Sequence, residues 1–257
     1  MSKEKTNWKL LGILTAIGMV AAFSIMPFTF ALVKIPDETN FAVLVIAQAL
    51  QTTFLIALTS FVGIRLSKKI GFQMVIFEKL SKGEKCFSDV NAILKSSVLW
   101  GFIGGVVVVI LCIPFWTVSV ELVKQEMAVD LWKSILTPIY GGFVEEIIFR
   151  LFFLTLLIWV TTKFKKNEDG KPTRIGVWIA IIISSVIFGL GHLGITNAMT
   201  AVTSALIIRA VLLNGVVSVI FSILYWKKGL ESAMIAHFSA DIVLHILIPH
   251  GIAKIFL

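Results

Sequence analysis

Six side chains suited to acid–base chemistry or charge stabilisation lie within apolar stretches of this sequence. The stretches are YGGFVEEIIFRLFF (140–153), VIFGLGHLGI (186–195) and MIAHFSADIVLH (234–245), and the residues are Glu145, Glu146, Arg150, His192, His237 and Asp241. A charged side chain near the centre of a bilayer costs at least ~2.5 kcal/mol, so such residues usually face one another or a polar cavity. Carboxylates and imidazoles are also common general bases. We therefore expect these residues to form one catalytic site.

The spacing of the two glutamates gives them different partners on a helix. Glu146 and Arg150 are four residues apart with the acid first, an arrangement that favours an ion pair along one helix face. Glu145 lies about 100° around the helix from Glu146 and points elsewhere. We expect Arg150 to neutralise Glu146 and Glu145 to remain available as a general base. The alternative is a purely structural ion cluster of all three side chains.

A histidine occupies a similar four-residue pattern in the second stretch. His192 follows Phe188 by four residues, and Gly189 and Gly191 lie between them. Small residues of this kind allow helices in a membrane to approach closely. A structural alternative for His192 is a hydrogen bond to a neighbouring backbone carbonyl.

The third stretch carries a polar stripe. His237, Asp241 and His245 follow one another at i, i+4 and i+8, so they share one helix face and predict a site that faces inward. His245 is nearest the outer end, and a position at the membrane interface is its alternative. Arg209, in the preceding apolar run, is expected to extend to the interface or to pair with an acid.

Two reaction schemes fit this set of residues. In the first, Glu145 deprotonates a water that His192 helps to orient, while His237 and Asp241 stabilise the oxyanion. In the second, Glu145, His192 and His237 bind a divalent metal such as zinc, and the metal activates the water. No H-E-x-x-H zinc pattern is present, which favours the first scheme. Serine catalysis is disfavoured because Ser239 and His237 would lie on different helix faces and no G-x-S-x-G occurs.

The elements that position these residues are expected to be membrane-spanning helices. Hydrophobic residues make up 58% of the 257 residues, charged residues make up 15%, and the mean hydropathy is +0.96. A helix that crosses the hydrocarbon core needs about 20 apolar residues. Seven runs meet this need: 8–33, 41–64, 97–120, 131–160, 175–195, 199–226 and 229–248. The fold class is therefore all-α, a polytopic membrane bundle of about seven helices, because unpaired strand edges are not tolerated in lipid.

The net charge of +8 predicts the orientation of these helices. If the seven runs alternate from a cytoplasmic N-terminus, the basic residues of segments 1–9, 65–95, 163–174 and 227–228 all lie inside. This asymmetry follows the positive-inside rule. It indicates a membrane protein that contacts the lipid bilayer, and it gives no reason to expect a nucleic-acid partner.

The whole chain, 1–257, is expected to form a single membrane domain. Spans 1–3 (8–130) would be scaffold with a basic cytoplasmic loop at 65–96, and 131–248 would carry the catalytic residues. Within that loop, 71–80 could form a short amphipathic surface helix or an ordinary connection. Cys86 and Cys112 fall in a cytoplasmic loop and a span, so no disulfide is expected.

The three motifs together resemble a known family. Their order, Glu145-Glu146-x-x-x-Arg150, Phe188-x-x-x-His192 and His237-x-x-x-Asp241 over roughly 130–248, is similar to the CPBP family, also called Abi or CaaX-protease and bacteriocin-processing proteins. The resemblance implies an intramembrane endopeptidase in which Glu145 and His192 activate water. It further implies that Glu146 and Arg150 form a supporting pair and that His237 and Asp241 complete the oxyanion side. Eukaryotic members usually have asparagine at the last position, so here Asp241 could instead orient His237.

The resemblance also suggests the kind of substrate. We expect cleavage of a small peptide or a membrane protein in a bacterial plasma membrane, with peptide maturation or bacteriocin self-immunity as the biological role. A general role on prenylated CaaX proteins is disfavoured by the small cytoplasmic portion. The rival hypotheses are a non-proteolytic immunity or partner-binding protein and a proton-coupled transporter.

Overall fold

The computed structural model describes residues 7–256 except 34 and 37, and the described part is helical with short connections. Its α-helices are α1 (Trp8–Ser24), α2 (Met26–Leu32), α3 (Phe41–Ile70), α4 (Val75–Lys82), α5 (Phe87–Cys112), α6 (Trp116–Met127), α7 (Leu131–Ser134), α8 (Thr137–Tyr140), α9 (Thr155–Phe164), α10 (Arg174–Gly191), α11 (Leu193–Met199), α12 (Ser204–Lys228), α13 (Leu230–Asp241) and α14 (Ala253–Phe256). One 3-10 segment, η1 (Ile113–Phe115), and three π-helical segments, η2 (Gly141–Glu145), η3 (Ile147–Leu154) and η4 (Ile242–Ile252), connect some of these helices. The all-α prediction is confirmed.

Six stretches of the described chain are long and apolar enough to cross a membrane. They are Trp8–Leu32, Phe41–Ile70, Phe87–Met127, Arg174–Met199, Ser204–Lys228 and Leu230–Ile255. Each corresponds to one of the seven predicted runs. The remaining run, 131–160, is not among the six; it is divided into α7, α8, η2, η3 and the start of α9.

The segment 65–96, expected as a basic cytoplasmic loop, is largely helical. Helix α3 continues to Ile70, where Gly71 ends it with a left-handed φ of 78°, and α5 already begins at Phe87. Basic residues at the ends of these helices are compatible with a membrane-spanning helix, because their long side chains can extend to the membrane surface. Between the two helices, α4 forms the short amphipathic helix that was one of the two alternatives for this segment.

Helix α4 is attached to the N-terminal end of α13. Glu231 accepts a hydrogen bond from the backbone N–H of Phe77 at 2.9 Å, and the N–H of Leu230 donates to the carbonyl of Gln73 at 3.1 Å. Gly229, with a φ of 97°, makes the turn between α12 and α13. These contacts fix the end from which α13 enters the bundle.

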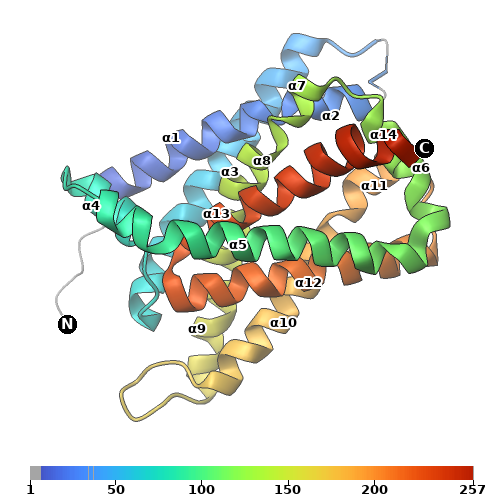
Figure 1. The fold of residues 1–257 in the computed structure, drawn as a ribbon. Helices are drawn as coiled ribbons and strands as arrows, with labels where there is room; N and C mark the ends of the chain where they lie inside the picture. The colour runs from blue at the N-terminus through green and yellow to red at the C-terminus, as the bar shows by residue number, and fades with distance from the viewer. Residues whose placement is uncertain (1–6, 34, 37, 257) are drawn as a thin grey trace.

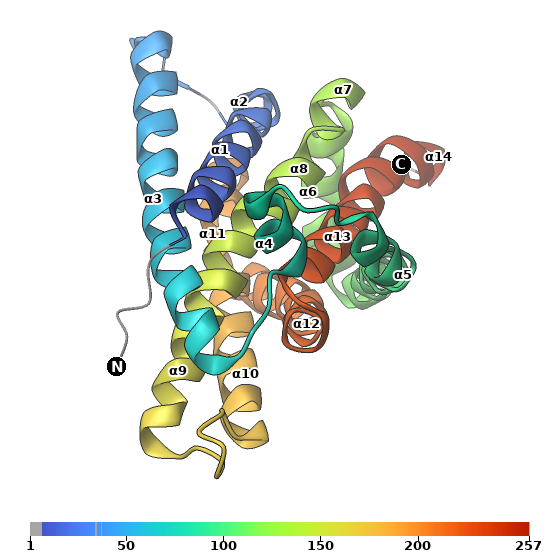
Figure 2. The same ribbon diagram turned by 90° about the vertical axis from the view of Figure 1, so that its left-hand side faces the viewer.

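Helix α13 lies among α5, α12 and η2 (Figures 1 and 2). Glycines make this packing close on two sides. A Cβ atom at Gly101 of α5 would overlap the carbonyl oxygen of Ala236, and one at Gly142 of η2 would lie 3.1 Å from the carbonyl oxygen of Met234. Such direct backbone contact is the usual role of small residues between membrane helices. Because α13 carries His237 and Asp241, these glycines also set the position of two predicted site residues.

Helices from the first half of the chain complete the bundle. In Figures 1 and 2, α1 lies beside α3, and α9 and α10 extend together away from the rest of the bundle. Gly63 of α3 packs directly on η3, since a Cβ there would be 2.6 Å from the carbonyl oxygen of Leu151. The N-terminal helices thus hold the segment that contains the two glutamates.

Candidate active site

A cavity of about 860 Å³ lies between the helices of the bundle, and four of the six predicted site residues line it. These four are Glu145, His192, His237 and Asp241, while Glu146 and Arg150 are fully buried beside it. The wall includes residues of α1, α2, α3, α5 and α6 as well as the predicted catalytic segment. The first three spans therefore help to form the cavity in addition to supporting the fold.

The glutamates come from a π-helical part of the chain. Gly141–Glu145 and Ile147–Leu154 both have π-helical hydrogen bonding, with Glu146 between them. π-helical turns inside helices are uncommon and often occur at functional sites. One local contact stabilises this backbone: the hydroxyl of Thr155 donates to the carbonyl of Arg150 at 2.9 Å and also contacts the hydroxyl of Tyr225 at 2.8 Å.

Glu146 is the centre of a buried ion network. Its Oε1 atom lies 3.2 Å from Nη1 of Arg150 and 2.7 Å from Nδ1 of His237. The ion pair expected from the four-residue spacing is therefore present, and it has a histidine as an additional member. Arg150 also donates to the carbonyl and hydroxyl oxygens of Ser218, at 3.2 and 2.9 Å. The network joins η3, α12 and α13, and Glu145 pairs neither with Arg150 nor with Ser218.

The two ring nitrogens of His237 have different neighbours: Nδ1 contacts Glu146, and Nε2 lies near the carboxylates of the cavity. Because a carboxylate accepts hydrogen bonds, Nδ1 of His237 donates to Glu146. The Nε2 atom lies 3.7 Å from Oε2 of Glu145 and 3.6 Å from Oδ1 of Asp241. The ring also stacks on Phe221, with 4.5 Å between ring centroids. Its orientation is thus determined by contacts on three sides.

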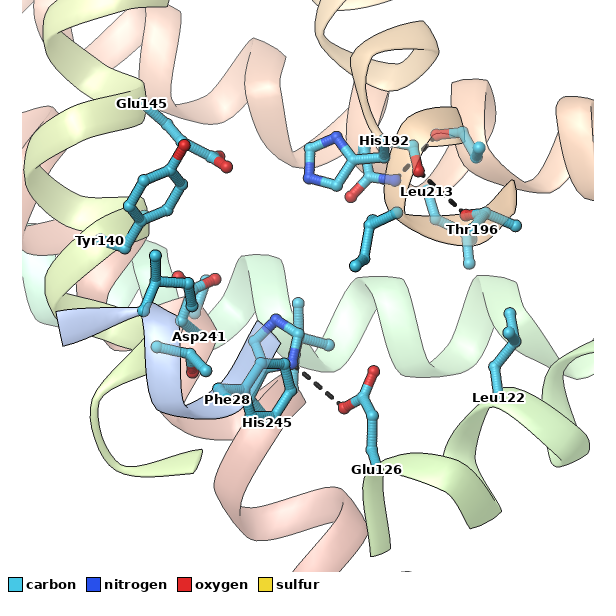
Figure 3. Close-up of a pocket in the computed structure, with 18 of the residues that line it drawn as sticks. Phe28, Leu122, Glu126, Tyr140, Glu145, His192, Thr196, Leu213, Asp241 and His245 are labelled. Atoms are coloured by element: carbon cyan, nitrogen blue, oxygen red, sulfur yellow. Dashed lines mark hydrogen bonds and ion pairs between the residues drawn. The ribbon is translucent and has the colours of Figure 1, made fainter. Parts of the chain in front are cut away.

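His192 and Glu145 lie on opposite walls of the cavity (Figure 3). Nδ1 of His192 lies 2.9 Å from the carbonyl oxygen of Phe188, to which it must donate, so the neutral ring presents Nε2 as an acceptor. This is the carbonyl contact considered as the structural alternative, yet the ring still lines the cavity. The Phe188 ring lies between the two histidines, with centroids 4.8 Å from His192 and 5.9 Å from His237.

Asp241 packs directly against the backbone of Gly141. A Cβ atom at Gly141 would overlap Oδ2 of Asp241 and lie 3.1 Å from Nε2 of His237. Any larger residue at Gly141 would therefore displace the two polar side chains of α13. No local pattern marks Gly141 as a site residue, although it lies within the YGGFVEE stretch.

The arrangement of the predicted metal ligands can be compared with a metal site. Among residues 7–256 without 34 and 37, no group of three or more His, Cys, Asp or Glu side chains is arranged to hold a metal ion. Glu145, His192 and His237, the predicted ligands, share the cavity without forming such a group.

Several polar residues besides the predicted site residues also line the cavity. Nδ1 of His245 lies 3.1 Å from Oε2 of Glu126, and both residues line the cavity. Glu126 was not a candidate because it lies between two predicted spans, and only the folded chain brings it to His245. Tyr140 lines the cavity beside Glu145 (Figure 3). Arg209 also lines the cavity and has Ser119 as a hydrogen-bond partner.

The fold and site define a membrane-embedded helical bundle with a buried carboxylate–histidine cavity. Residues 127–243 match the family described as type II CAAX prenyl endopeptidase Rce1-like, and all six predicted site residues lie in the matched segment. This match confirms the resemblance inferred from the three motifs: the segment 127–243 is similar to a CaaX-protease family. Searches of the curated proteins and of the solved structures found no significant match.

Proposed function

We propose that this protein is an intramembrane endopeptidase that hydrolyses a peptide bond in a small peptide or a membrane protein. The observation that supports this function most directly is the shared cavity of Glu145, His192, His237 and Asp241. The family match adds the reaction class, since its description is that of an endopeptidase. The cavity wall is mostly apolar, which suits a hydrophobic substrate segment that enters from the bilayer.

In the proposed mechanism, Glu145 and His192 activate the water. Glu145 is free for this role because Glu146, not Glu145, pairs with Arg150. Glu145 removes a proton from a water bound between it and Nε2 of His192, and the hydroxide attacks the carbonyl carbon. Glu145 then returns the proton to the amide nitrogen as the C–N bond breaks, which yields a carboxylate and an amine.

His237 stabilises the negative charge that develops on the carbonyl oxygen. As an imidazolium, its ring donates from both nitrogens, so Nε2 can serve the oxyanion while Nδ1 stays bonded to Glu146. Asp241, with Oδ1 at 3.6 Å from Nε2, orients the ring and compensates its charge before the substrate enters. An ionised Asp241 cannot itself donate to the oxyanion.

The distribution of basic residues and the family match suggest where in the cell the protein acts. We place the protein in a bacterial plasma membrane with a cytoplasmic N-terminus, as the basic segments indicate. Its substrate is then a secreted peptide or a membrane protein of the same cell, with peptide maturation or bacteriocin self-immunity as the role.

The proposal is tested by peptide cleavage with the purified protein in detergent. Wild type, Glu145→Gln and His192→Ala are incubated with a panel of membrane-anchored and secreted peptides, and products are identified by mass spectrometry. We expect both variants to lose about 10²–10⁴-fold in rate, the usual contribution of a positioned acid–base group. Glu121→Gln is the matched control, because Glu121 is an exposed carboxylate outside the cavity.

The outcomes separate the rival hypotheses. Equal cleavage by wild type and Glu145→Gln would exclude Glu145 as the base. Absence of cleavage, together with full biological activity of both variants, would favour a partner-binding protein. Substrate-dependent proton flux in liposomes that Glu145→Gln abolishes would favour a transporter. Loss of cleavage after chelation would favour the metal scheme.

A further inference from the structure

Arg209 places a positive charge in the wall of the cavity. Pairing with an acid was one of the two expectations for it, and no ion pair of Arg209 is found among the described residues. Within the described residues, no carboxylate lies within the 4.0 Å ion-pair distance of its guanidinium. Glu126, another acid of the cavity wall, is paired with His245. A charged group in a membrane-embedded cavity commonly belongs to a substrate or ion pathway.

The guanidinium of Arg209 is anchored through its Nε atom. Its Nε atom donates to the hydroxyl of Ser119 at 2.8 Å, and Ser119 is fully buried on α6. The Sγ atom of Cys112 lies 3.1 Å from the same hydroxyl. In the part of the chain that the structure describes, the two Nη atoms of Arg209 have no hydrogen-bond partner. The anchored Nε leaves these two donors for another group in the cavity.

Arg209 and His192 both lie near a close contact between α10 and α12. A Cβ atom at Gly189 would be 2.6 Å from Cα of Val211 and 2.9 Å from the carbonyl oxygen of Ala210. His192 is three residues after Gly189, and Arg209 directly precedes Ala210. Each is therefore within one turn, about 3.6 residues, of this helix contact. Both residues also line the cavity, so a group bound to Arg209 would share it with the water that His192 is proposed to orient.

We propose that Arg209 is a specificity-determining residue that binds a carboxylate of the peptide substrate close to the bond that is cut. The planar guanidinium can donate two parallel hydrogen bonds to a carboxylate, and this geometry is stronger and more selective than a single contact. The proposal rests on the peptidase function proposed above. The carboxylate could come from the free C-terminus of the peptide or from an aspartate or glutamate side chain.

Binding and cleavage are measured separately so that the two proposals can fail independently. The probes are dansyl-labelled hydrophobic peptides in three forms: with a free C-terminal carboxylate, with a C-terminal amide, and with a C-terminal amide plus one internal aspartate. Binding to the purified full-length protein in detergent is followed by fluorescence anisotropy. We expect wild type to bind one carboxylate form at least about tenfold more tightly than the uncharged amide, as expected for a charge-assisted pair.

The variants identify Arg209 as the cause of this preference. In Arg209→Gln the preference should disappear, and in Arg209→Lys it should be reduced because the bidentate geometry is lost. Lys227→Gln is the matched control: it removes one positive charge from the other end of α12, where Lys227 lies over the ring of Trp226, and it should retain the preference.

Each outcome has a definite meaning. Preference for the C-terminal acid or for the internal aspartate supports the proposal and identifies the source of the carboxylate. Equal binding of all three peptides by wild type, no binding of any, or an unchanged preference in Arg209→Gln would overturn it. If the preference is present and none of the peptides is cleaved, the carboxylate site stands and the peptidase function is the part in doubt.

Discussion

Glu145 and Glu146 are neighbours in the sequence with different surroundings in the fold. Glu146 is fully buried and contacts both Arg150 and His237, whereas the side chain of Glu145 lines the cavity and is 20% exposed. A buried charge that loses its partner is strongly destabilising, while an exposed carboxylate has water as an alternative partner. The same chemical change at these two positions should therefore have different effects on stability.

We predict that Glu146→Gln lowers the free energy of unfolding by about 3–5 kcal/mol, because it leaves Arg150 buried without a counter-charge. Glu145→Gln should change stability little and still remove most activity. Thermal unfolding of both variants in detergent, compared with wild type, measures the difference. Equal melting temperatures for the two variants would contradict the structural role given to Glu146.

At the scale of single residues, helical spacing predicted contacts within one helix but not contacts between helices. The Glu146–Arg150 pair follows from four-residue spacing, which places both side chains on one face. The hydrogen bond from His237 to Glu146 joins residues 91 positions apart, and no local pattern predicts it. The Glu126–His245 pair was missed for the same reason.

At the scale of elements, the helix that carries the glutamates differs most from expectation. Apolar periodicity predicted one regular span over 131–160, but the segment contains two π-helical parts. The pattern of apolar residues reports burial, and it does not distinguish i→i+4 from i→i+5 hydrogen bonding. The glycines give a partial signal, since Gly141 and Gly142 precede the glutamates and allow α13 to approach.

We predict that Gly141→Ala lowers activity at least about tenfold and destabilises the protein by about 1–3 kcal/mol, the usual cost of overpacking. The added methyl group would overlap Asp241 and press on His237. Gly12→Ala in α1 is the matched control, because a Cβ there meets no atom within 4 Å. That control should be neutral or slightly stabilising, since alanine favours helix over glycine. Full activity of Gly141→Ala would show that α13 can shift without loss of the site.

At the scale of the whole molecule, orientation in the membrane decides on which side the cavity lies. Alternation from a cytoplasmic N-terminus puts the connection at 121–130 outside and the connection at 161–174 inside. Leu32, Glu126 and Ile252 line the cavity and lie near helix ends on the outer side of this arrangement. We therefore expect the cavity in the outer half of the membrane, where a secreted peptide could reach it.

This orientation predicts the labelling of two exposed aspartates, Asp130 and Asp169, when each is replaced by cysteine. The native thiols, Cys86 and Cys112, are first replaced by serine. In intact cells, a membrane-impermeant thiol reagent should label Asp130→Cys and leave Asp169→Cys unmodified, and permeabilised cells should label both. The reverse pattern would place the N-terminus outside and the cavity in the cytoplasmic half. A substrate with a cytoplasmic tail would then replace the secreted peptide, because the cavity would open toward that side.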